Sequence, residues 1–385
     1  MMSNARVLFI GHTGQIGGAE LILLDVVEGR QQSSVFLFEE GPLSKALADK
    51  GLDLILSKWG KGLSQFHRDS SPLAAFPLVG RLAAIVLEIA RTSRRYDVVY
   101  ANGQKAFILA SIASVIAWRP LIWHLHDIIS SDHFGATQRR AQVLLANACA
   151  TKVIVPSQAA ATAFIDAGGK RELIDIVPNG LAIQPDPSSP EELRRKLDLP
   201  TGPLVGVFSR LAAWKGQHVL IEAVARLPGV NCIIVGDALF GEQDYAARLN
   251  EMVADLGVGD RIRFLGHRND VPKLMKAVDV MVHPSIDPEP FGRTLVEAML
   301  AGVPVVATNA GAAPDILEGG KAGTLVPPND AVALASAIST VLAKPEQLSS
   351  QLEYASVRAR MHYSLKQMLD TIGLVIRKAQ TGALA

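Results

Sequence analysis

Short apolar runs alternate with longer amphipathic stretches along this chain. The runs are rich in Val, Ile and Leu and are bounded by Gly, Asn, Asp or Pro, which is typical of buried parallel strands. In the first half they lie at Val7–Ile10, Ser34–Phe38, Leu52–Leu56, Val98–Ala101, Leu121–His126 and Lys152–Pro156. Helical patterns between them, at Ala19–Val27, Ser44–Lys50 and Arg81–Ser93, complete a strand and helix alternation that predicts an α/β doubly wound sheet.

The same pattern starts again after a proline-rich segment. Pro185, Pro187, Pro190, Pro200 and Pro203 oppose a continuous core element, so we interpret this segment as a linker with one short helix. A second series of strands follows at Leu204–Phe208, Cys232–Val235, Ile262–Leu265, Val280–His283, Val303–Thr308 and Gly323–Val326. We expect two Rossmann-like domains facing a cleft, at residues 1–181 and 182–360. An amphipathic helix over Met361–Lys378 occupies the last segment, 361–385.

Composition and charge argue against several classes of protein. The 38 Lys and Arg residues balance 37 Asp and Glu, which argues against a protein that coats nucleic acid. Cys149 and Cys232 lie in apolar segments without a CxxC pair or a nearby His, so we expect no metal site and a reducing compartment. The N-terminus lacks the apolar core of a secretion signal, and the longest apolar run, Ala106–Trp118, is shorter than the roughly 20 residues of a membrane span. These features predict a cytoplasmic protein.

Ligands of such sheets bind beyond the carboxyl ends of the strands, so the loops there hold the candidate site residues. The first loop, Gly11–Glu20, contains Gly17 and Gly18, whose lack of side chains lets the backbone approach a phosphate. Its spacing is not GxGxxG, which argues against a nicotinamide or flavin site. Tight packing explains this loop equally well.

Two cations, Arg210 and Lys215, share one loop of the second half. Arg can grip a phosphate with two hydrogen bonds while Lys supplies a point charge, a combination suited to a diphosphate. The loop is not a Walker A sequence, and a pair of solvated charges is the alternative.

The predicted strand Leu121–His126 contains two histidines, His124 and His126. His126 is nearest its carboxyl end and could bond a sugar hydroxyl or transfer a proton. Strand histidines are more often structural, and we expect that role for His124, His218 and His283.

Two carboxylates, Glu289 and Glu297, flank a predicted helix start. Pro290 and Gly292 oppose regular structure, so Glu289 should lie on a loop and Glu297 about one turn into the helix. The helix N-terminus favours an anion and the carboxylates accept hydrogen bonds from hydroxyls, which suits a phosphate that carries sugars on both sides.

In combination these motifs resemble the family-4 retaining glycosyltransferases of GT-B fold, the glycosyl transferases group 1. The second half carries most of the resemblance, in the order Arg210 with Lys215, Gly266-His267, His283-Pro284-Ser285, Glu289-Pro290-Phe291-Gly292 with Glu297-Ala298, and Gly311–Asp315. The first half adds Gly17-Gly18, His126, Pro156-Ser157 and Val177–Gly180, so the resemblance spans most of the chain.

The resemblance implies a nucleotide diphosphate sugar as donor, for which we favour a UDP-sugar such as UDP-glucose, and a glycan or lipid-linked sugar as acceptor. The hexosyl group would move with net retention of anomeric configuration. No cofactor and no metal are implied, because Arg210 and Lys215 would take up the charge of the leaving nucleotide.

The resemblance also implies a role for each donor-binding residue. Gly17 and Gly18 would close on the distal phosphate, and Leu295 and Val296 would add backbone N–H contacts to phosphate. Glu297 would bond the ribose, with His267 and Arg268 beside the base. Glu289 and the Phe291 and Gly292 amides would hold the transferred sugar, and His126 would contact it near the reacting carbon. The implied catalytic residues are His126, Arg210, Lys215 and Glu289, and the last helix would cross back onto the first domain.

Two departures leave questions open. The family commonly has Gly-Gly-x-Pro-Glu where this chain has Gly311–Asp315, so a sugar contact there is in doubt. No obvious nucleophile is present, and the family analogy favours same-face attack, in which the leaving phosphate receives the acceptor proton, over a covalent route.

Alternatives to this enzyme are a nucleotide-sugar epimerase of the same fold and a non-catalytic sugar-nucleotide-binding protein. The first would need further acid and base carboxylates, and the second would be expected to have lost one of the four residues Arg210, Lys215, Glu289 and Glu297.

Two further segments bear on the acceptor and on membranes. The loop Trp59–Arg68 could select the acceptor or be an ordinary surface loop. Arg91, Arg94 and Arg95 end a predicted helix, where they complement its dipole, while contact with anionic lipid at a membrane surface is the alternative.

Overall fold

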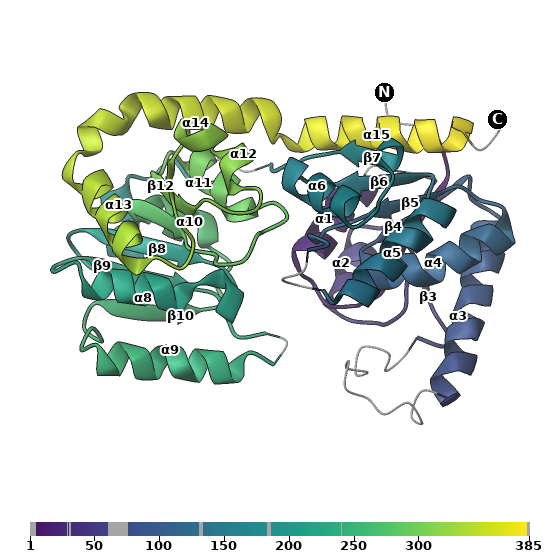
Figure 1. Ribbon diagram of the computed structural model, residues 1–385, viewed down its shortest axis with the longest axis horizontal. Coiled ribbons are helices and arrows are strands. Elements are labelled where there is room, and N and C mark those ends of the chain that lie inside the picture. Colours follow the sequence, from purple (N-terminus) through teal and green to yellow (C-terminus); the bar gives the residue numbers. More distant parts are fainter. Residues whose placement is uncertain are drawn as a thin grey trace. The chain divides into compact units, whose positions relative to one another are not determined.

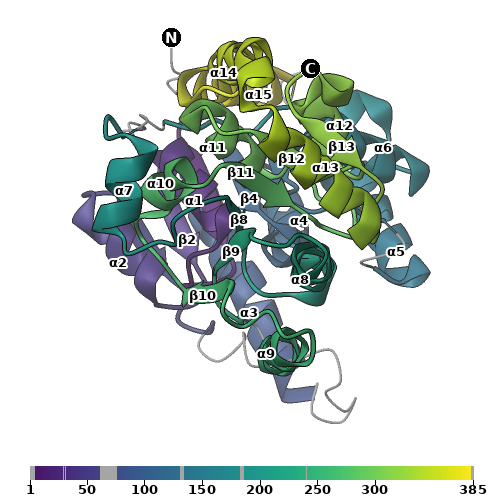
Figure 2. The ribbon, with the colours of Figure 1, turned by 90° about the vertical axis from the view of Figure 1, so that its left-hand side faces the viewer.

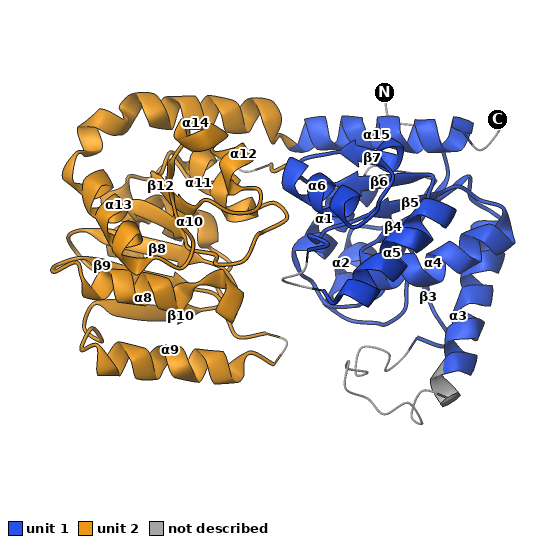
Figure 3. Cartoon of the chain, viewed as in Figure 1, with its two compact units in different colours: residues 1–179, 365–385 blue, residues 180–364 orange. Residues whose placement is uncertain are grey.

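The computed structural model describes residues 5–28, 30, 32–60, 76–130, 134–182, 186–239 and 241–382. Its contacts divide the chain into two compact units, Met1–Asn179 with Leu365–Ala385, and Gly180–Ser364 (Figure 3). Most of the loop considered for acceptor selection falls in 61–75, outside the described residues. No helix in the described part of the chain is long and apolar enough to cross a bilayer.

The first unit contains a seven-stranded parallel sheet in the order β3-β2-β1-β4-β5-β6-β7 (Figure 1). Its strands are β1 (Val7–Gly11), β2 (Ser34–Leu37), β3 (Asp53–Leu56), β4 (Val98–Asn102), β5 (Leu121–His124), β6 (Lys152–Val155) and β7 (Ile174–Ile176). The carboxyl ends of all these strands lie at one edge, because every pair in the sheet is parallel.

Helices cover both faces of this sheet, and alternate side chains of each strand point to opposite faces. Leu8 and Ile10 of β1 join one core with the helices α3 (Phe76–Ser93), α4 (Gln104–Ala117), α5 (Ala136–Cys149) and α6 (Gln158–Asp166). Val7 and Phe9 join the other core with α1 (Gly18–Val27), α2 (Pro42–Asp49) and α15 (Leu365–Gly382).

The second unit contains a six-stranded parallel sheet in the order β10-β9-β8-β11-β12-β13. Its strands are β8 (Leu204–Phe208), β9 (Asn231–Val235), β10 (Ile262–Gly266), β11 (Val280–His283), β12 (Val305–Thr308) and β13 (Thr324–Val326). Both units therefore have the Rossmann-like, doubly wound architecture that the alternation predicted.

Two cores again flank the second sheet, and Figure 2 shows the helices around it. One is built with α8 (Gln217–Ala225), α9 (Gln243–Asp255) and α13 (Ala331–Ala343). The other is built with α7 (Pro190–Lys196), α10 (Val271–Ala277), α11 (Arg293–Ala301), α12 (Ala313–Ile316) and α14 (Ser349–His362).

The end of the chain differs from the expectation. The predicted helix start at Met361 is wrong, because α14 runs to His362 and a separate helix, α15, begins at Leu365. Met361 is 63% exposed and belongs to the second unit. The apolar stripe of α15, which includes Met368, Ile372 and Ile376, packs against the core of the first unit. The contacts thus divide the units after Asn179 and after Ser364, where the sequence suggested residues 181 and 360.

Candidate active site

Three loops of the second unit lie side by side where β8, β9 and β10 end. The backbone N–H of Ser209 donates to Val235 O at 3.0 Å, and that of Gly236 donates to Gly266 O at 2.9 Å. Gly236 has a φ of 138°, and a Cβ there would lie 2.0 Å from Ser209 O. A glycine is therefore required for this close approach of the loops.

The loop after β8 places both predicted cations beside the indole ring of Trp214. Nζ of Lys215 lies 4.2 Å from the centroid of the Trp214 ring, and Cζ of Arg210 lies 5.4 Å from it. Gly216 ends this turn with a φ of 71°, and a Cβ on it would lie 2.0 Å from Pro284 O. Trp214 was not predicted as a site residue, although its position between the two cations could have indicated it.

Lys215 forms an ion pair with Glu289. Its Nζ lies 2.7 Å from Oε2 of Glu289, and both side chains are largely buried, at 15% and 9% exposure. The other carboxylate oxygen, Oε1, lies 3.0 Å from Nε2 of His283 and accepts a hydrogen bond from the Ser285 hydroxyl. His283 therefore contacts a candidate site residue, whereas we expected it to be merely structural.

The charge on Glu289 is stabilised by these partners. Burial by itself would raise the pKa of this carboxyl, but Lys215 and His283 hold the pKa well below its ordinary value of 4.5. Thr308 supports the arrangement from β12, because its hydroxyl donates to Ser285 O at 2.6 Å. Glu289 is consequently an ionised, fixed hydrogen-bond acceptor at neutral pH.

The segment that departs from the family pattern packs against the backbone of Glu289. The Ala312 N–H donates to Glu289 O at 3.0 Å. Gly311 has a φ of 59°, and a Cβ on it would lie 2.3 Å from Glu289 N. The Asp315 side chain, in contrast, is exposed. This segment thus positions Glu289, whatever Asp315 itself contacts.

Gly292 leads into α11 with a φ of 86°. The side chains of Phe291, Leu295 and Val296 are buried at 3%, 0% and 0% exposure. The backbone N–H of Leu295 donates to Gly292 O at 3.0 Å. A contact of these residues with a donor would therefore involve their backbone, and it stays a prediction.

Glu297 has a different electrostatic environment from Glu289. Its Oε1 lies 3.0 Å from Nε of Arg293, one turn earlier on α11. Burial raises the pKa of the Glu297 carboxyl above 4.5 although Arg293 opposes the rise. An ionised Glu297 is therefore insufficiently compensated within the second unit, which suits a carboxylate that accepts hydrogen bonds from a ligand.

The residues expected beside the base lie on the loop after β10. His267 is exposed, and Arg268 makes two hydrogen bonds to Asp270, at 2.8 and 2.7 Å. The bond from Gly236 to Gly266 joins this loop to the loop after β9. Their contact with a base stays a prediction.

In the first unit, Gly17 and Gly18 lie at the start of α1. The Gly17 N–H donates to Oε2 of Glu20 at 3.0 Å. Glu20 is buried at 9% exposure, and this burial raises the pKa of its carboxyl. The predicted phosphate contact of Gly17 and Gly18 remains to be tested.

His126 lies just beyond β5, which ends at His124 and not at His126 as expected. Its Nε2 lies 2.8 Å from Oδ1 of Asn102, whose Nδ2 donates to Ala19 O at 3.2 Å. Because the Asn102 amide donates through nitrogen, its oxygen must accept the Nε2–H of His126, which leaves Nδ1 as an acceptor. Burial lowers the pKa of His126 to about 3, so the ring is neutral at pH 7.

Asn102 is a second site residue that was not predicted from the sequence. It is 2% exposed at the carboxyl end of β4, and its amide joins His126 to the first turn of α1. The rule that ligands bind beyond strand ends could have indicated it. His124 has the expected structural role, since its Nδ1 lies 2.6 Å from the Tyr100 hydroxyl, as does His218, whose Nδ1 lies 3.0 Å from the Tyr245 hydroxyl.

No group of three or more His, Cys, Asp or Glu side chains gathers around a potential metal position in the described ranges.

Two family models match the chain. The model for "Glycosyl transferases group 1" matches residues 189–358, and the model for "Glycosyl transferase 4-like domain" matches residues 29–180. Together they cover parts of both units.

Solved and curated proteins are similar to the chain over different lengths. HepE of Anabaena, solved in complex with UDP-glucose, is 40% identical with a TM-score of 0.86, over 97% of this chain and 99% of that one. The 2-deoxystreptamine glucosyltransferase of Streptomyces kanamyceticus is 29% identical over 80% of this chain and 90% of its own. The lipopolysaccharide core biosynthesis glycosyltransferase LpsE of Rhizobium meliloti is 40% identical, but this match spans 39% of the chain and 43% of LpsE.

Proposed function

This chain belongs to the group 1 glycosyltransferases, and from that membership we propose that it transfers a hexosyl group from a nucleotide diphosphate sugar to a glycan or lipid-linked sugar. We propose UDP-glucose or a related UDP-sugar as the donor, because HepE, which is 40% identical along nearly its whole length, was solved with UDP-glucose.

The observation that carries the proposal is the cluster of opposite charges in the second unit. Arg210 and Lys215 share the Trp214 ring, and Lys215 also contacts the ionised Glu289. A donor that places its diphosphate near the cations and its sugar hydroxyls near Glu289 would satisfy both kinds of group. Neutral sugars lack the diphosphate, and a free nucleotide has no second sugar beyond its diphosphate for Glu289 to bind, so a nucleotide sugar is the ligand that fits.

In the proposed reaction the bond between the anomeric carbon and the phosphate oxygen breaks, and the acceptor oxygen bonds to the same carbon from the same face. The acceptor proton passes to the leaving phosphate, so that the products are the glycoside and the nucleoside diphosphate. Arg210 and Lys215 stabilise the negative charge that develops on the phosphate. Retention of anomeric configuration follows from same-face attack.

We further propose that transfer needs no added metal ion. The reason is chemical: two cationic side chains on one loop can neutralise a diphosphate, which is the task of a divalent ion in a metal-dependent transferase. Transfer that persists in excess chelator would support this part of the proposal, and strict dependence on a divalent ion would contradict it.

Calorimetric titration with UDP-glucose, UDP-galactose, GDP-mannose and ADP-glucose, all in chelator, tests the donor. We expect UDP-glucose or UDP-galactose to bind, and Arg210→Ala to weaken that binding about tenfold or more because a charged hydrogen bond to phosphate is lost. Arg226→Ala is the matched control, since Arg226 is exposed just beyond the end of α8. An equal loss of UDP-sugar affinity in Arg210→Ala and Arg226→Ala would contradict the role of Arg210.

The products distinguish the proposal from its two alternatives. A transferase releases nucleoside diphosphate when an acceptor or water takes the sugar. An epimerase would return an isomeric nucleotide sugar without that release, and a binding protein would leave the nucleotide sugar unchanged.

A further inference from the structure

Helix α4 of the first unit is apolar on its outer face as well as its inner face. Its inner side chains, such as Phe107 and Ala110, are buried in the core. Its outer face, which carries no charged side chain beyond Lys105 in the first turn, exposes Ile108, Ile112, Val115 and Ile116. A helix that is apolar all round is ordinarily covered by protein or lipid. In the described part of the chain this outer face stays open to solvent.

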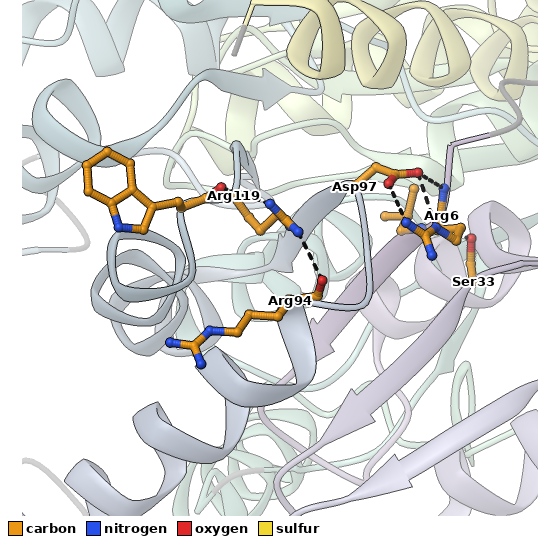
Figure 4. Close-up of polar contacts among 7 residues, drawn as sticks. Arg6, Ser33, Arg94, Asp97 and Arg119 are labelled. Atoms are coloured by element: carbon orange, nitrogen blue, oxygen red, sulfur yellow. Dashed lines mark hydrogen bonds and ion pairs between the residues drawn. The ribbon is translucent and has the colours of Figure 1, made fainter. Parts of the chain in front are cut away.

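Trp118 continues the apolar face beyond the end of α4. It is 89% exposed, and it has a φ of 52°, a left-handed conformation that helix ends usually give to glycine. The Arg119 guanidinium donates to Trp118 O at 3.2 Å and to Arg94 O at 2.9 Å, so the backbone of this turn is fixed to the segment after α3 (Figure 4). The structure therefore holds a bulky aromatic ring in solvent at a conformational cost, and among the described residues no buried contact of that ring offsets it.

Three exposed arginines lie at the adjoining end of α3. They are Arg91, Arg94 and Arg95, and the bond from Arg119 to Arg94 O joins their segment to the end of α4. Figure 4 shows the Arg94 side chain extending away from the Arg6 and Asp97 ion pair. Within the described ranges none of the three arginines takes part in an ion pair. Helix complementation accounts for their place at a helix end but not for their position beside an exposed apolar face.

We propose that this α3–α4 surface, defined by Ile108, Ile112, Val115, Ile116 and Trp118 with Arg91, Arg94 and Arg95, docks on a membrane that contains anionic lipid. The aliphatic side chains and the indole would enter the boundary between headgroups and acyl chains, where tryptophan is favoured. The arginines would contact lipid phosphates. The proposal goes beyond the sugar transfer, because it depends on neither the donor nor the reaction.

The arrangement of charge favours a membrane over a second copy of the chain. A two-fold interface centred on the α3–α4 surface would place two sets of three arginines in one contact area, and the carboxylates nearest to them in the sequence, Glu88 and Asp97, are already bonded to Ser57 and Arg6. Nucleic acid would neutralise the arginines but would leave the aliphatic face uncovered. An anionic membrane complements both parts at once.

Vesicle flotation tests the proposal with the full chain. We expect it to float with vesicles of phosphatidylglycerol and phosphatidylcholine, to bind phosphatidylcholine alone much more weakly, and to lose affinity as salt is added. Changing Arg91, Arg94 and Arg95 together to Gln should weaken binding by about fivefold for each arginine lost. Arg226→Gln in the second unit is the control for a change of charge, and it should bind as the wild type does.

The apolar part is tested by Trp118→Gly and by Ile112→Ser combined with Val115→Ser. Glycine suits the left-handed conformation at position 118, so Trp118→Gly should be at least as stable as wild type and still lose most vesicle binding. Val332→Ser with Val357→Ser, at exposed positions of α13 and α14, is the matched control. Unchanged flotation of Trp118→Gly, or equal binding to neutral vesicles, would overturn the proposal. So would a dimer in sedimentation that Trp118→Gly dissociates, because a second copy would then cover the face.

Discussion

Nζ of Lys215 lies 2.7 Å from Oε2 of Glu289, and both groups are largely buried. This ion pair joins the loop after β8 to the loop after β11, so the residue proposed to hold the diphosphate also stabilises the carboxylate proposed to hold the sugar. Lys215 therefore has a structural and a functional task, and the two can be separated by experiment.

Lys215→Met should impair both stability and transfer. Glu289 would keep His283 and Ser285 but lose its lysine, and the loss of one partner of a buried pair costs about 3 kcal/mol of unfolding free energy. Adding Glu289→Gln removes the uncompensated charge, so the double variant should recover most of that loss in urea denaturation. Transfer should stay about 100-fold or more below wild type in both variants, because a charge-stabilising group is missing. Recovery of activity together with stability would contradict the role of Lys215 in the reaction.

The pKa of Glu289 predicts how stability varies with acid. A folded-state pKa that lies well below 4.5 means that ionised Glu289 contributes stability above about pH 4.5, and that this contribution is lost as the pH falls towards the folded-state pKa. The difference in unfolding free energy between wild type and Glu289→Gln should therefore be largest near neutral pH and should shrink below pH 4.5. A difference in unfolding free energy that is constant between pH 7 and pH 3 would show that the charge of Glu289 does not contribute to stability.

Glu297→Gln should have the opposite effect on stability. The pKa of Glu297 is raised in the folded protein, so its ionisation costs stability as the pH rises above about 4.5, and glutamine avoids that cost. We expect the melting temperature of the ligand-free variant to rise by a few degrees at neutral pH. Its calorimetric affinity for UDP should nevertheless fall, since a neutral amide is a weaker acceptor for ribose hydroxyls. Unchanged affinity would count against the ribose contact.

Asn102 should determine the proton position on His126. NMR of labelled histidine should show a neutral ring with the proton on Nε2, and no titration of this ring above about pH 5 because its pKa is about 3. Asn102→Asp cannot donate to Ala19 O and places a negative charge beside His126, so the pKa of His126 should rise and the pH profile of kcat should change. Asn102→Ser, which keeps a neutral polar group, is the comparison. A pH profile of kcat that is identical in wild type and Asn102→Asp would contradict the role of Asn102 in positioning the proton of His126.

The local pattern of apolar residues was sufficient to predict most strands of both sheets, but not β7, the last strand of the first sheet. The strands at 7–10 and 204–208, for example, are buried apolar runs, and the structure has strands there. β7 was missed because it is only three residues long and includes Asp175, whose carboxylate pairs with Lys378 of α15 at 3.0 Å. The start of the last helix was also wrong, because Met361 fits the apolar spacing although it is exposed on α14.

The candidate site was predictable as a set of strand-end residues but not as a network. The loop motifs indicated Arg210, Lys215 and Glu289 one by one. Their pairing depends on how the loops after β8 and β11 pack, and no local pattern encodes that packing. His283 was assigned a structural role for the same reason. Its contact with Glu289 depends on the folded loop, in which the Ser285 hydroxyl donates to the same carboxylate and the Thr308 hydroxyl donates to Ser285 O.

A retaining transfer from a UDP-sugar determines which anomer of glucose is released first. Without acceptor, a glycosyltransferase slowly passes its sugar to water, so proton NMR can follow UDP-glucose in the presence of enzyme and chelator and record which anomer of glucose appears first. We expect α-glucose to appear before mutarotation, in an amount equal to the UDP released, and no glucose with Arg210→Ala combined with Lys215→Ala. Initial release of β-glucose would contradict retention, and the absence of turnover with every nucleotide sugar would contradict the proposed activity.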